Sequence, residues 1–301
     1  MNQPEAARDR LRRSLLFVPG AEPRKLERAR EAGADTLIFD LEDAVAPDRK
    51  AAARGYVADA LRAGGFGAAE LAVRVNAPRS DDLAADLDAV LDAGCRTLLL
   101  PKAESAADIA QVVQAIRARI GGGHAGGQAL QLLLLVESPL GIASALALGR
   151  VDPCVAALCF GHADFSLEMG LREADASRGV TFHARCTLAI AAKAGGVAPI
   201  DSVYLAVKDE AGFRADAELG LALGFEGKLC IHPRQAELAN EVYTPRPEEI
   251  AHARRVLEAA DAARAEGRGV FALDGKMIDA PIVAVQRRVL ERARRAGALD
   301  H

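Results

Sequence analysis

The sequence predicts a (β/α)8 TIM barrel followed by a C-terminal helical lid extension. Short apolar runs alternate with amphipathic segments, the alternation repeats eight times before residue 233, and the runs are too short for globular helices. A doubly wound open sheet is the alternative, but no G-x-G-x-x-G motif follows the first run. We therefore expect a barrel catalytic domain over residues 1–245 and a lid or oligomerisation segment over residues 246–301.

Each predicted strand is a run of mostly apolar residues, which is typical of buried parallel strands. The runs lie at 14–18, 36–39, 71–76, 97–100, 130–136, 155–160, 202–206 and 227–232. Helices are predicted from about residue 22 and over 48–62, 80–93, 105–120, 180–194 and 209–223. After Pro245 and Pro247 the pattern changes to a charged helix at 248–265, a short apolar run and a last helix rich in Arg and Ala.

Composition and charge exclude several classes of function. The formal net charge is −4, Trp is absent and aromatic residues make up 4% of the chain, so no nucleic-acid surface is expected. No apolar run approaches the ~20 residues of a membrane span, and residues 1–13 contain no signal core. Five scattered cysteines without a C-x-x-C pair are typical of a reduced, cytoplasmic protein.

Carboxylates follow the fifth and sixth predicted strands. Glu137 comes directly after the run 130–136, and Asp164 comes four residues after the run 155–160. The C-terminal strand ends of a barrel carry its chemistry, and two carboxylates there without a Cys or His cluster suit Mg²⁺. The alternative is that each carboxylate caps the helix that follows it. These two residues alone do not separate the two interpretations.

Arg74 lies between two valines in a predicted strand, where an inward position is expected. Its guanidinium is suited to fork-like binding of a carboxylate or carbonyl oxygen. The alternative is an ion pair with Glu42 or Asp43, and both roles are compatible. Other polar residues expected at the strand ends are Asp40, Asn76, Lys102 and His232.

Such a ring of charges would be costly to bury without an ion or a ligand. Lys102 is a candidate Schiff-base lysine, as in some barrel aldolases, although the carboxylates favour metal chemistry instead. The backbone amides of Gly161, His162 and Ala163, near a predicted helix start, are candidates to hold a substrate carboxylate.

Six motifs occur in order along the chain. They are Leu-Phe-Val-Pro-Gly at 16–20, Asp-Leu-Glu-Asp-Ala-Val at 40–45, Val-Arg-Val-Asn at 73–76, Leu-Pro-Lys-Ala-Glu at 100–104, Val-Glu-Ser-Pro-Leu-Gly at 136–141 and Gly-Lys-Met-Ile-Asp at 275–279. Together they resemble the citrate lyase β subunit/malyl-CoA lyase family, the acyl-CoA lyases of the wider HpcH/HpaI aldolase group. The resemblance extends from about residue 13 to residue 295.

The resemblance implies a barrel that binds Mg²⁺ through Glu137 and Asp164 and uses Arg74 in its active site. It also implies a catalytic aspartate, matched by Asp279, on a C-terminal segment that caps the barrel of a neighbouring subunit. A homo-oligomer, either a trimer or a hexamer, is therefore expected.

The part of the family that contacts coenzyme A is similar to the first loop of this chain, with Phe17, Arg24 and Lys25. The implied activity is reversible, Claisen-type cleavage of a 3-hydroxyacyl-CoA, such as malyl-CoA or citramalyl-CoA, to acetyl-CoA and a 2-oxo acid. In this scheme Asp279 moves the proton at the acetyl carbon. Arg74 stabilises the enolate, while Glu42 and Asp43 orient Arg74 and the metal-bound waters.

Two other activities are compatible with the same motifs. Related sequences hydrolyse malyl-CoA as thioesterases, and others act on citryl thioesters as the β subunit of a citrate lyase complex. The chain reads Gly-His-Ala-Asp-Phe at 161–165 where citrate lyase β subunits often read Gly-Ala-Glu-Asp-Tyr, which favours a stand-alone CoA-ester lyase. An acyl carrier protein is a candidate partner, for which Arg287, Arg288, Arg292, Arg294 and Arg295 would supply a basic patch. The alternative, which is favoured, is that these arginines form a solvated helix face or a contact between subunits.

Overall fold

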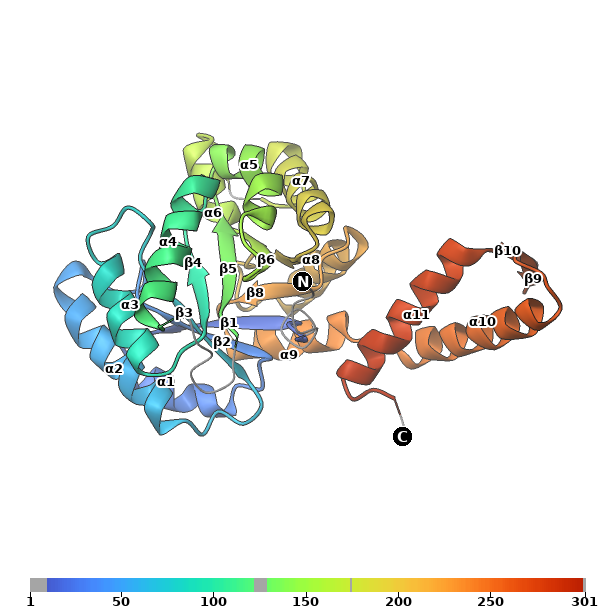
Figure 1. Cartoon of the computed structure of the whole chain (residues 1–301), viewed down its shortest axis with the longest axis horizontal. Coiled ribbons are helices and arrows are strands. Elements are labelled where there is room, and N and C mark those ends of the chain that lie inside the picture. Colours follow the sequence, from blue (N-terminus) through green and yellow to red (C-terminus); the bar gives the residue numbers. More distant parts are fainter. Residues whose placement is uncertain (1–9, 122–128, 174, 300–301) are drawn as a thin grey trace. The chain divides into compact units, whose positions relative to one another are not determined.

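The computed structural model describes residues 10–121, 129–173 and 175–299. Eight parallel strands close into a barrel, since β1 pairs with both β2 and β8 (Figure 1). The predicted barrel is therefore confirmed. Most of the segment expected to lack a signal core, residues 1–9, lies outside the described residues. The strands are β1 Ser14–Pro19, β2 Thr36–Asp40, β3 Glu70–Arg74, β4 Thr97–Leu100, β5 Gln131–Val136, β6 Val155–Phe160, β7 Ala198–Asp201 and β8 Gly227–Cys230.

Helices connect successive strands and surround the barrel (Figure 1). Ser105 and Ser138 cap two of them, because each hydroxyl accepts a hydrogen bond from the backbone N–H three residues later. The helices of this part are α1 Pro23–Arg28, α2 Lys50–Ala63, α3 Leu83–Asp92, α4 Ala106–Arg119, α5 Pro139–Arg150, α6 His162–Glu168, α7 Gly179–Gly195, α8 Glu210–Ala222 and α9 Pro233–Tyr243, with 3₁₀ turns at Ala29–Glu31 and Pro47–Arg49.

The seventh strand is not where the sequence predicts it. The run 202–206 lies in the loop after β7, and β7 itself has only four residues, with Pro199 second among them. Proline lacks the N–H that a central strand donates, so the sequence does not reveal this strand. The third and eighth strands are also shorter than predicted, ending at Arg74 and Cys230. Consequently Asn76 and His232 lie on loops.

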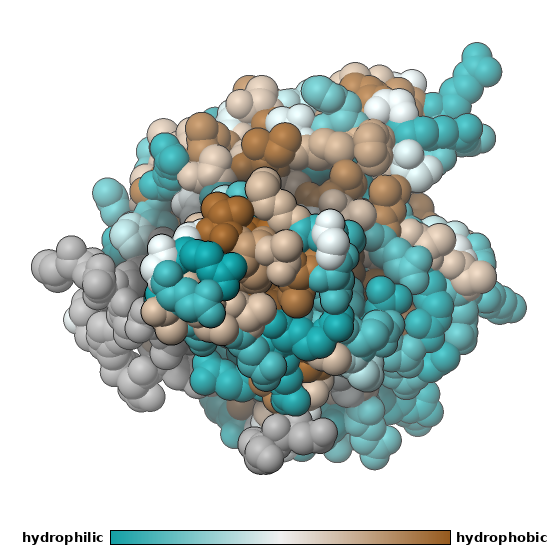
Figure 2. All heavy atoms as spheres, turned by 90° about the vertical axis from the view of Figure 1, so that its right-hand side faces the viewer, coloured by the Kyte–Doolittle hydropathy of each residue, from teal (hydrophilic) through white to brown (hydrophobic). Residues whose placement is uncertain are grey.

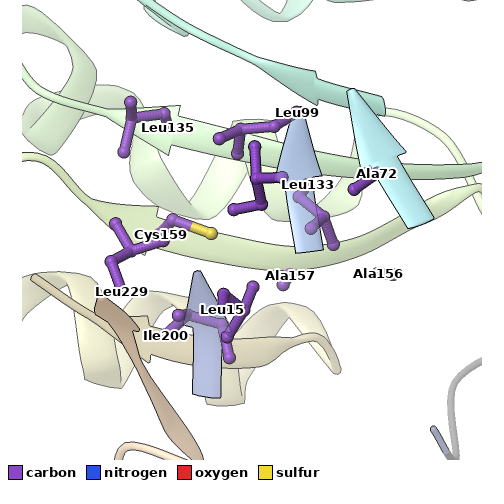
Figure 3. Close-up of a cluster of buried hydrophobic side chains, with 11 residues drawn as sticks. Leu15, Ala72, Leu99, Leu133, Leu135, Ala156, Ala157, Cys159, Ile200 and Leu229 are labelled. Atoms are coloured by element: carbon purple, nitrogen blue, oxygen red, sulfur yellow. The ribbon is translucent and has the colours of Figure 1, made fainter. Parts of the chain in front are cut away.

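The barrel interior is filled with apolar side chains. One buried cluster combines residues from all eight strands, including Leu15, Leu133, Cys159 and Leu229. Figure 3 shows how the labelled members of this cluster lie among the strands around them. The filled interior excludes a pore, and it leaves the strand ends as the place for chemistry.

A buried polar cluster closes the N-terminal end of the barrel. Arg12 donates to both carboxylate oxygens of Glu70, the first residue of β3, at 2.6 and 2.7 Å. Thr36 and Thr97, the first residues of β2 and β4, donate to the same carboxylate. Arg12 also donates to Gln131, at the start of β5. Burial alone would raise the pKa of Glu70, but the hydrogen bonds and positive charge of Arg12, together with the hydrogen bond from Thr36 and the charge of Arg10, outweigh burial and lower it.

The chain divides into two compact units, one up to Asn240 and one from Glu241 onward. The second unit consists of α10 (Pro247–Ala265), the antiparallel pair β9 (Phe271–Leu273) and β10 (Lys276–Ile278), and α11 (Ala280–Arg295). Its small core is formed by Val256, Ala260, Ile278 and Val283.

The surface mixes apolar and polar side chains. Leu167 on α6 and Ile190 on α7 are 77% and 70% exposed. Figure 2 shows one face of the molecule, on which hydrophobic residues are interspersed among hydrophilic ones. In the described part of the chain, no helix has the length and apolar character that crossing a membrane requires.

A second buried charge cluster joins the outside of the barrel to its helices. Arg185 on α7 and Lys228 on β8 both pair with Asp201 at the end of β7 and with Asp216 on α8. The side chains of Arg185, Lys228 and Asp201 are fully buried. Burial would raise the pKa of Asp201, but the two cations outweigh burial and lower it.

Replacing Asp201 by Asn should therefore destabilise the barrel strongly. The change leaves two fully buried cations facing the single carboxylate of Asp216, and breaking a buried ion pair in this way costs about 3–5 kcal/mol. Urea unfolding followed by circular dichroism measures the loss. Glu210→Gln is the matched control, because it removes one partner of the exposed pair with Arg234 and should lower the stability far less than Asp201→Asn. Equal effects of the two variants would contradict the structural role of the cluster.

Candidate active site

Arg74 is the last residue of β3 and is 9% exposed. Its Nε and Nη2 donate to the two carboxylate oxygens of Asp40, the last residue of β2, at 2.7 and 2.6 Å. Its Nη1 lies 3.1 Å from Glu42 and 3.5 Å from Asp43, and its guanidinium lies over the ring of Phe17 at 4.9 Å. Burial would lower the pKa of Arg74, but the carboxylates outweigh burial and raise it. The arginine is therefore a fixed, permanent cation at the mouth of the barrel.

The predicted ion pairs of Arg74 with Glu42 and Asp43 are both present. The bidentate partner, however, is Asp40, a role that the sequence does not indicate. Residues Asp40 and Arg74 are directly opposite each other in the β2–β3 register. The register depends on how β2 and β3 pair, and neither the motif at 40–45 nor the motif at 73–76 indicates this pairing by itself.

Glu42 is buried between two cations. Its Oε2 lies 3.1 Å from Arg74 Nη1 and its Oε1 lies 3.1 Å from Lys102 Nζ, but neither oxygen accepts a hydrogen bond of good geometry from the described residues. Burial raises the pKa of Glu42, and the two cations offset this only in part. A buried carboxylate that keeps unused acceptor capacity is typical of a site that receives a further donor or cation.

The Lys102 side chain is 53% exposed and forms its ion pair with Glu42. Burial tends to lower the pKa of Lys102, but Glu42 outweighs burial and raises it. A Schiff-base lysine has to be neutral to attack a carbonyl, and its pKa is normally depressed by burial or a neighbouring cation. The environment of Lys102 has the opposite effect, so it disfavours the Schiff-base interpretation.

Glu137 follows β5 and is 4% exposed. One carboxylate oxygen, Oε1, accepts a hydrogen bond from the backbone N–H of Lys102 at 2.8 Å. The other, Oε2, lies against Gly161, where an added Cβ would come within 2.8 Å of it and within 2.5 Å of Glu137 Cβ. Burial, together with the neighbouring carboxylates Glu42 and Asp164, raises the pKa of Glu137 to about 8.

Asp164 lies in the first turn of α6 and is exposed. The residue at the N-cap of α6 is Gly161, and no side chain makes a capping hydrogen bond there. At the next helix upstream, α5, the cap is Ser138. The alternative in which Glu137 and Asp164 serve as helix caps is therefore not what the structure shows. Gly161 and His162 begin α6, and His162 is buried with its ring 6.5 Å from that of Phe160.

A cavity of about 750 Å³ opens beside Arg74. This volume lies within the range of small-molecule sites. Phe17 and Lys25 line the cavity, whereas Arg24 lies on the same helix as Lys25 but outside the lining. The lining residues are Leu16, Phe17, Val18, Pro19, Lys25, Arg28, Ala29, Ala32, Asp40, Asp43, Ala44, Arg74, Val203, Ile231, His232 and Pro233.

Two basic side chains of this lining, Arg28 and His232, had no role assigned from the sequence. Arg28 adds a second cation near Lys25. His232 lines the cavity and accepts a hydrogen bond at Nδ1 from the backbone N–H of Arg234, at 3.1 Å. The spacing of Arg28, one helical turn after Lys25 on α1, was the signal that could have indicated it.

The loop that carries Glu42 is braced by Lys50 at the start of α2. The Lys50 ammonium donates to the carbonyls of Leu41 and Glu42, at 2.7 and 2.9 Å, and to Asn76 Oδ1 at 2.7 Å. Asn76 in turn donates to Asp86 on α3, so its side chain supports the loop. The sequence gives no signal for Lys50, because two of its partners are main-chain carbonyls.

Asp279 belongs to the C-terminal unit, where it is the N-cap of α11. Its Oδ1 accepts a hydrogen bond from the backbone N–H of Ile282 at 3.2 Å. Large apolar side chains of the same unit are exposed: Val270 by 53%, Met277 by 68% and Val285 by 52%. The capping bond gives Asp279 a structural role within its own unit.

The residues at the barrel mouth fit a hard divalent cation. Glu137 and Asp164 are carboxylates that follow consecutive strands, and Asp164 adds to the negative environment of Glu137. Within residues 10–121, 129–173 and 175–299, no group of three or more His, Cys, Asp or Glu side chains is arranged to hold a metal ion. Two carboxylates are nevertheless the usual protein share for Mg²⁺, which keeps several waters and takes substrate oxygens.

A parallel (β/α)8 barrel with charged side chains gathered at its C-terminal strand ends has the arrangement in which barrel enzymes hold their active sites. The chain belongs to the HpcH/HpaI aldolase/citrate lyase family, whose sequence model matches residues 13–233. This confirms the predicted family.

Three similar proteins illustrate the range of this family. Citrate lyase subunit beta of Escherichia coli K12 is 39% identical over 289 residues, covering 96% of this chain and 95% of that protein. A (3S)-malyl-CoA thioesterase of Cereibacter sphaeroides KD131 is 35% identical over 281 residues, covering 93% and 94%. A solved structure of CitE from Mycobacterium tuberculosis, in complex with magnesium, acetoacetate and coenzyme A, superposes with a TM-score of 0.79. Its sequence is 32% identical to this chain, and the match covers 95% of this chain and 99% of that one.

The raised pKa of Glu137 predicts a pH-dependent stability of the metal-free protein. The folded state holds this proton up to about pH 8, whereas the unfolded chain loses it near the usual value of 4.5. The contribution of Glu137 therefore lowers the free energy of unfolding as the pH rises from about 4.5 to about 8. The total loss is several kcal/mol, because a shift of one pKa unit corresponds to about 1.4 kcal/mol. Glu137→Gln should remove this slope and stabilise the EDTA-treated protein at pH 8. Urea unfolding between pH 5 and pH 8.5 measures it.

Glu168→Gln is a suitable control, since Glu168 is exposed on α6. The control should unfold with the pH dependence of the original protein. An unchanged slope in Glu137→Gln would contradict the assigned burial of this carboxylate.

Proposed function

We propose that the chain catalyses the Mg²⁺-dependent, reversible cleavage of a carbon–carbon bond in a 3-hydroxyacyl-CoA that carries a distal carboxylate. Malyl-CoA and citramalyl-CoA are the substrates of this type, and the products are acetyl-CoA with glyoxylate or pyruvate. The observation that carries the proposal is that a permanently charged Arg74, held by Asp40, lies at the same barrel mouth as the Glu137 and Asp164 carboxylates. Cleavage develops negative charge on the thioester and requires a held 2-oxo acid, and these groups suit the two tasks.

Glu137 and Asp164 are the proposed metal ligands. The M. tuberculosis relative, whose structure contains magnesium, acetoacetate and coenzyme A, supports magnesium as the ion that they would bind. When bound, Mg²⁺ supplies a Lewis acid that withdraws electron density from the carbonyl of the 2-oxo acid. The Lys102 amide holds Glu137, and the missing side chain at Gly161 leaves space for its carboxylate.

Arg74 is proposed to stabilise the enolate of acetyl-CoA. The C3 hydroxyl loses its proton to water as it becomes the carbonyl of the 2-oxo acid. The electron pair of the C2–C3 bond moves onto the thioester oxygen, where a fixed guanidinium in a water-poor site is most effective. Asp40 holds the guanidinium in a bidentate pair. Glu42 and Asp43 contact Nη1 and keep the Arg74 head group oriented, which is the positioning role proposed for them.

Substrate binding is proposed to use both sides of the mouth. Phe17 and Lys25 line the cavity that would hold the coenzyme A part, and Arg24 precedes Lys25 on α1 but lies outside the lining. The backbone amides of Gly161, His162 and Ala163, at the start of α6, would hold the distal carboxylate. The five cysteines are free in the structure, which supports the proposed cytoplasmic location.

Asp279 is proposed to transfer the proton at the acetyl carbon, and to do so from a second copy of the chain. The exposed Met277 near Asp279 and the exposed Val285 on α11 support a covering partner for this unit. A homotrimer or homohexamer would give every barrel one such aspartate. The boundary between the barrel domain and this lid segment, at residues 245 and 246, is part of the same proposal.

The thioesterase is the second candidate, supported by the C. sphaeroides relative. A citryl-thioester lyase subunit is supported by the E. coli relative, and the arginines of α11 would then meet an acyl carrier protein. A pull-down with an acyl carrier protein separates the citryl-thioester lyase subunit from a stand-alone enzyme.

An assay with malyl-CoA and citramalyl-CoA in parallel tests the function. We expect equal amounts of acetyl-CoA and a 2-oxo acid, lost on addition of EDTA and restored by Mg²⁺. Free CoA without acetyl-CoA would establish the thioesterase instead. Inactivity with both esters, together with activity on a citryl thioester, would overturn the proposal in favour of the citrate lyase subunit.

Mixing two inactive variants tests the action of Asp279 from a second copy. Asp279→Ala and Glu137→Gln should each lower kcat by at least about 100-fold, since each removes a group used in the chemical step. Co-refolded hetero-oligomers should recover about a quarter of the original activity, because a random assembly places an intact Asp279 beside an intact barrel at one site in four. No recovery, with mixed oligomers verified by mass spectrometry, would contradict action between copies.

A further inference from the structure

Lys102 has an unusual backbone conformation. Its φ is +52°, and among the described residues only one other non-glycine residue, Asp274, has a positive φ. L-amino acids with a side chain rarely adopt this left-handed region, because the Cβ approaches the backbone. Such a conformation persists only where surrounding contacts hold it, and it occurs preferentially at functional sites.

The left-handed turn brings the backbone of Lys102 to Glu137. The chain leaves β4 through Pro101, and the Lys102 N–H then donates to Glu137 Oε1 at 2.8 Å. The next residue, Ala103, donates its N–H to the carbonyl of Leu135 on β5, at 3.1 Å. The turn is therefore anchored to Leu135 of β5 as well as to the carboxylate that it holds.

The side chain of the same residue reaches a second carboxylate. Lys102 Nζ lies 3.1 Å from Glu42 Oε1, while the other oxygen of Glu42 faces Arg74 Nη1. Glu42 is buried, so without Lys102 its Oε1 would have no cation beside it. One residue thus links the carboxylate after β5 to the carboxylate of the β2–α2 loop.

We propose that Lys102 is a positioning residue that fixes Glu137 and Glu42 in the orientation needed to bind the divalent cation. This inference rests on the proposed function, in which Glu137 is a metal ligand. The backbone N–H of Lys102 orients the Glu137 carboxylate. The Lys102 ammonium holds one oxygen of Glu42, while the other oxygen faces Arg74. Partners that orient metal ligands in this way typically change metal affinity by about 10–100-fold when they are removed.

Four variants separate the contributions of Lys102. Lys102→Met removes the ammonium and keeps the strained backbone, and Lys102→Gly removes the ammonium but adopts a positive φ without strain. Lys102→Arg keeps a cation at the same place. Lys193→Met is the matched control, because Lys193 forms an exposed ion pair with Glu226 on the outside of the barrel.

Calorimetric titration with Mg²⁺ alone, on the full chain without substrate, is the first measurement. Lys102→Met and Lys102→Gly should bind Mg²⁺ at least about 10-fold more weakly, whereas Lys102→Arg and Lys193→Met should remain within about 3-fold of the original protein. Lys102→Gly should unfold at the same urea concentration as the original or at a higher one. Weaker metal binding without lower stability distinguishes positioning from a merely structural role.

A double variant tests whether Lys102 acts through Glu42. If it does, Lys102→Met combined with Glu42→Gln should bind Mg²⁺ no more weakly than the weaker single variant. Additive losses would overturn the link to Glu42.

The control Glu137→Gln separates failure of this inference from failure of the proposed function. If the original protein binds Mg²⁺ and Glu137→Gln does not, the metal site stands, and normal binding by Lys102→Met and Lys102→Gly would overturn the role of Lys102 alone. If Glu137→Gln binds Mg²⁺ as well as the original protein, the proposed metal site fails and the role of Lys102 fails with it.

Discussion

The arrangement at the barrel mouth depends on the pair between Arg74 and Asp40. These residues end neighbouring strands and face each other in register, so the bidentate contact follows from the pairing of β2 with β3. The contact uses Nε and Nη2 and leaves Nη1 for Glu42. Without this cation, Asp40 and Glu42 would be buried carboxylates with too little compensation. The same charge that stabilises the loop is thus the one available to a substrate.

Periodicity alone predicts most of the fold. Seven of the eight strands have apolar runs that the sequence displays directly, and the closed barrel follows from their number and order. β7 could not be predicted, because it has four residues and contains Pro199, whereas the more strand-like run 202–206 is a loop. Its place is determined by pairing with β6 and β8, which supply the partners that its own sequence does not suggest.

The candidate site was predictable where a residue type is informative by itself. A buried arginine beside two carboxylates and a Glu at a strand end both carry their own signal, and Ser138 in Glu-Ser-Pro explains why Glu137 is not the cap of α5. Contacts made through the main chain carry no such signal. Lys50 braces a loop through carbonyl oxygens, and the amide of Lys102 holds Glu137, so neither contact can be recognised from side-chain chemistry.

The closed N-terminal end of the barrel affects the order in which reactants bind and leave. Arg12 and Glu70 close the N-terminal end, and apolar side chains of the described strands fill the interior between the two ends. In the proposed reaction, the two reactants that meet at the strand ends would therefore arrive from the same side. When two reactants use the same entrance, they are expected to bind and leave one after the other rather than independently. This arrangement favours an ordered kinetic mechanism.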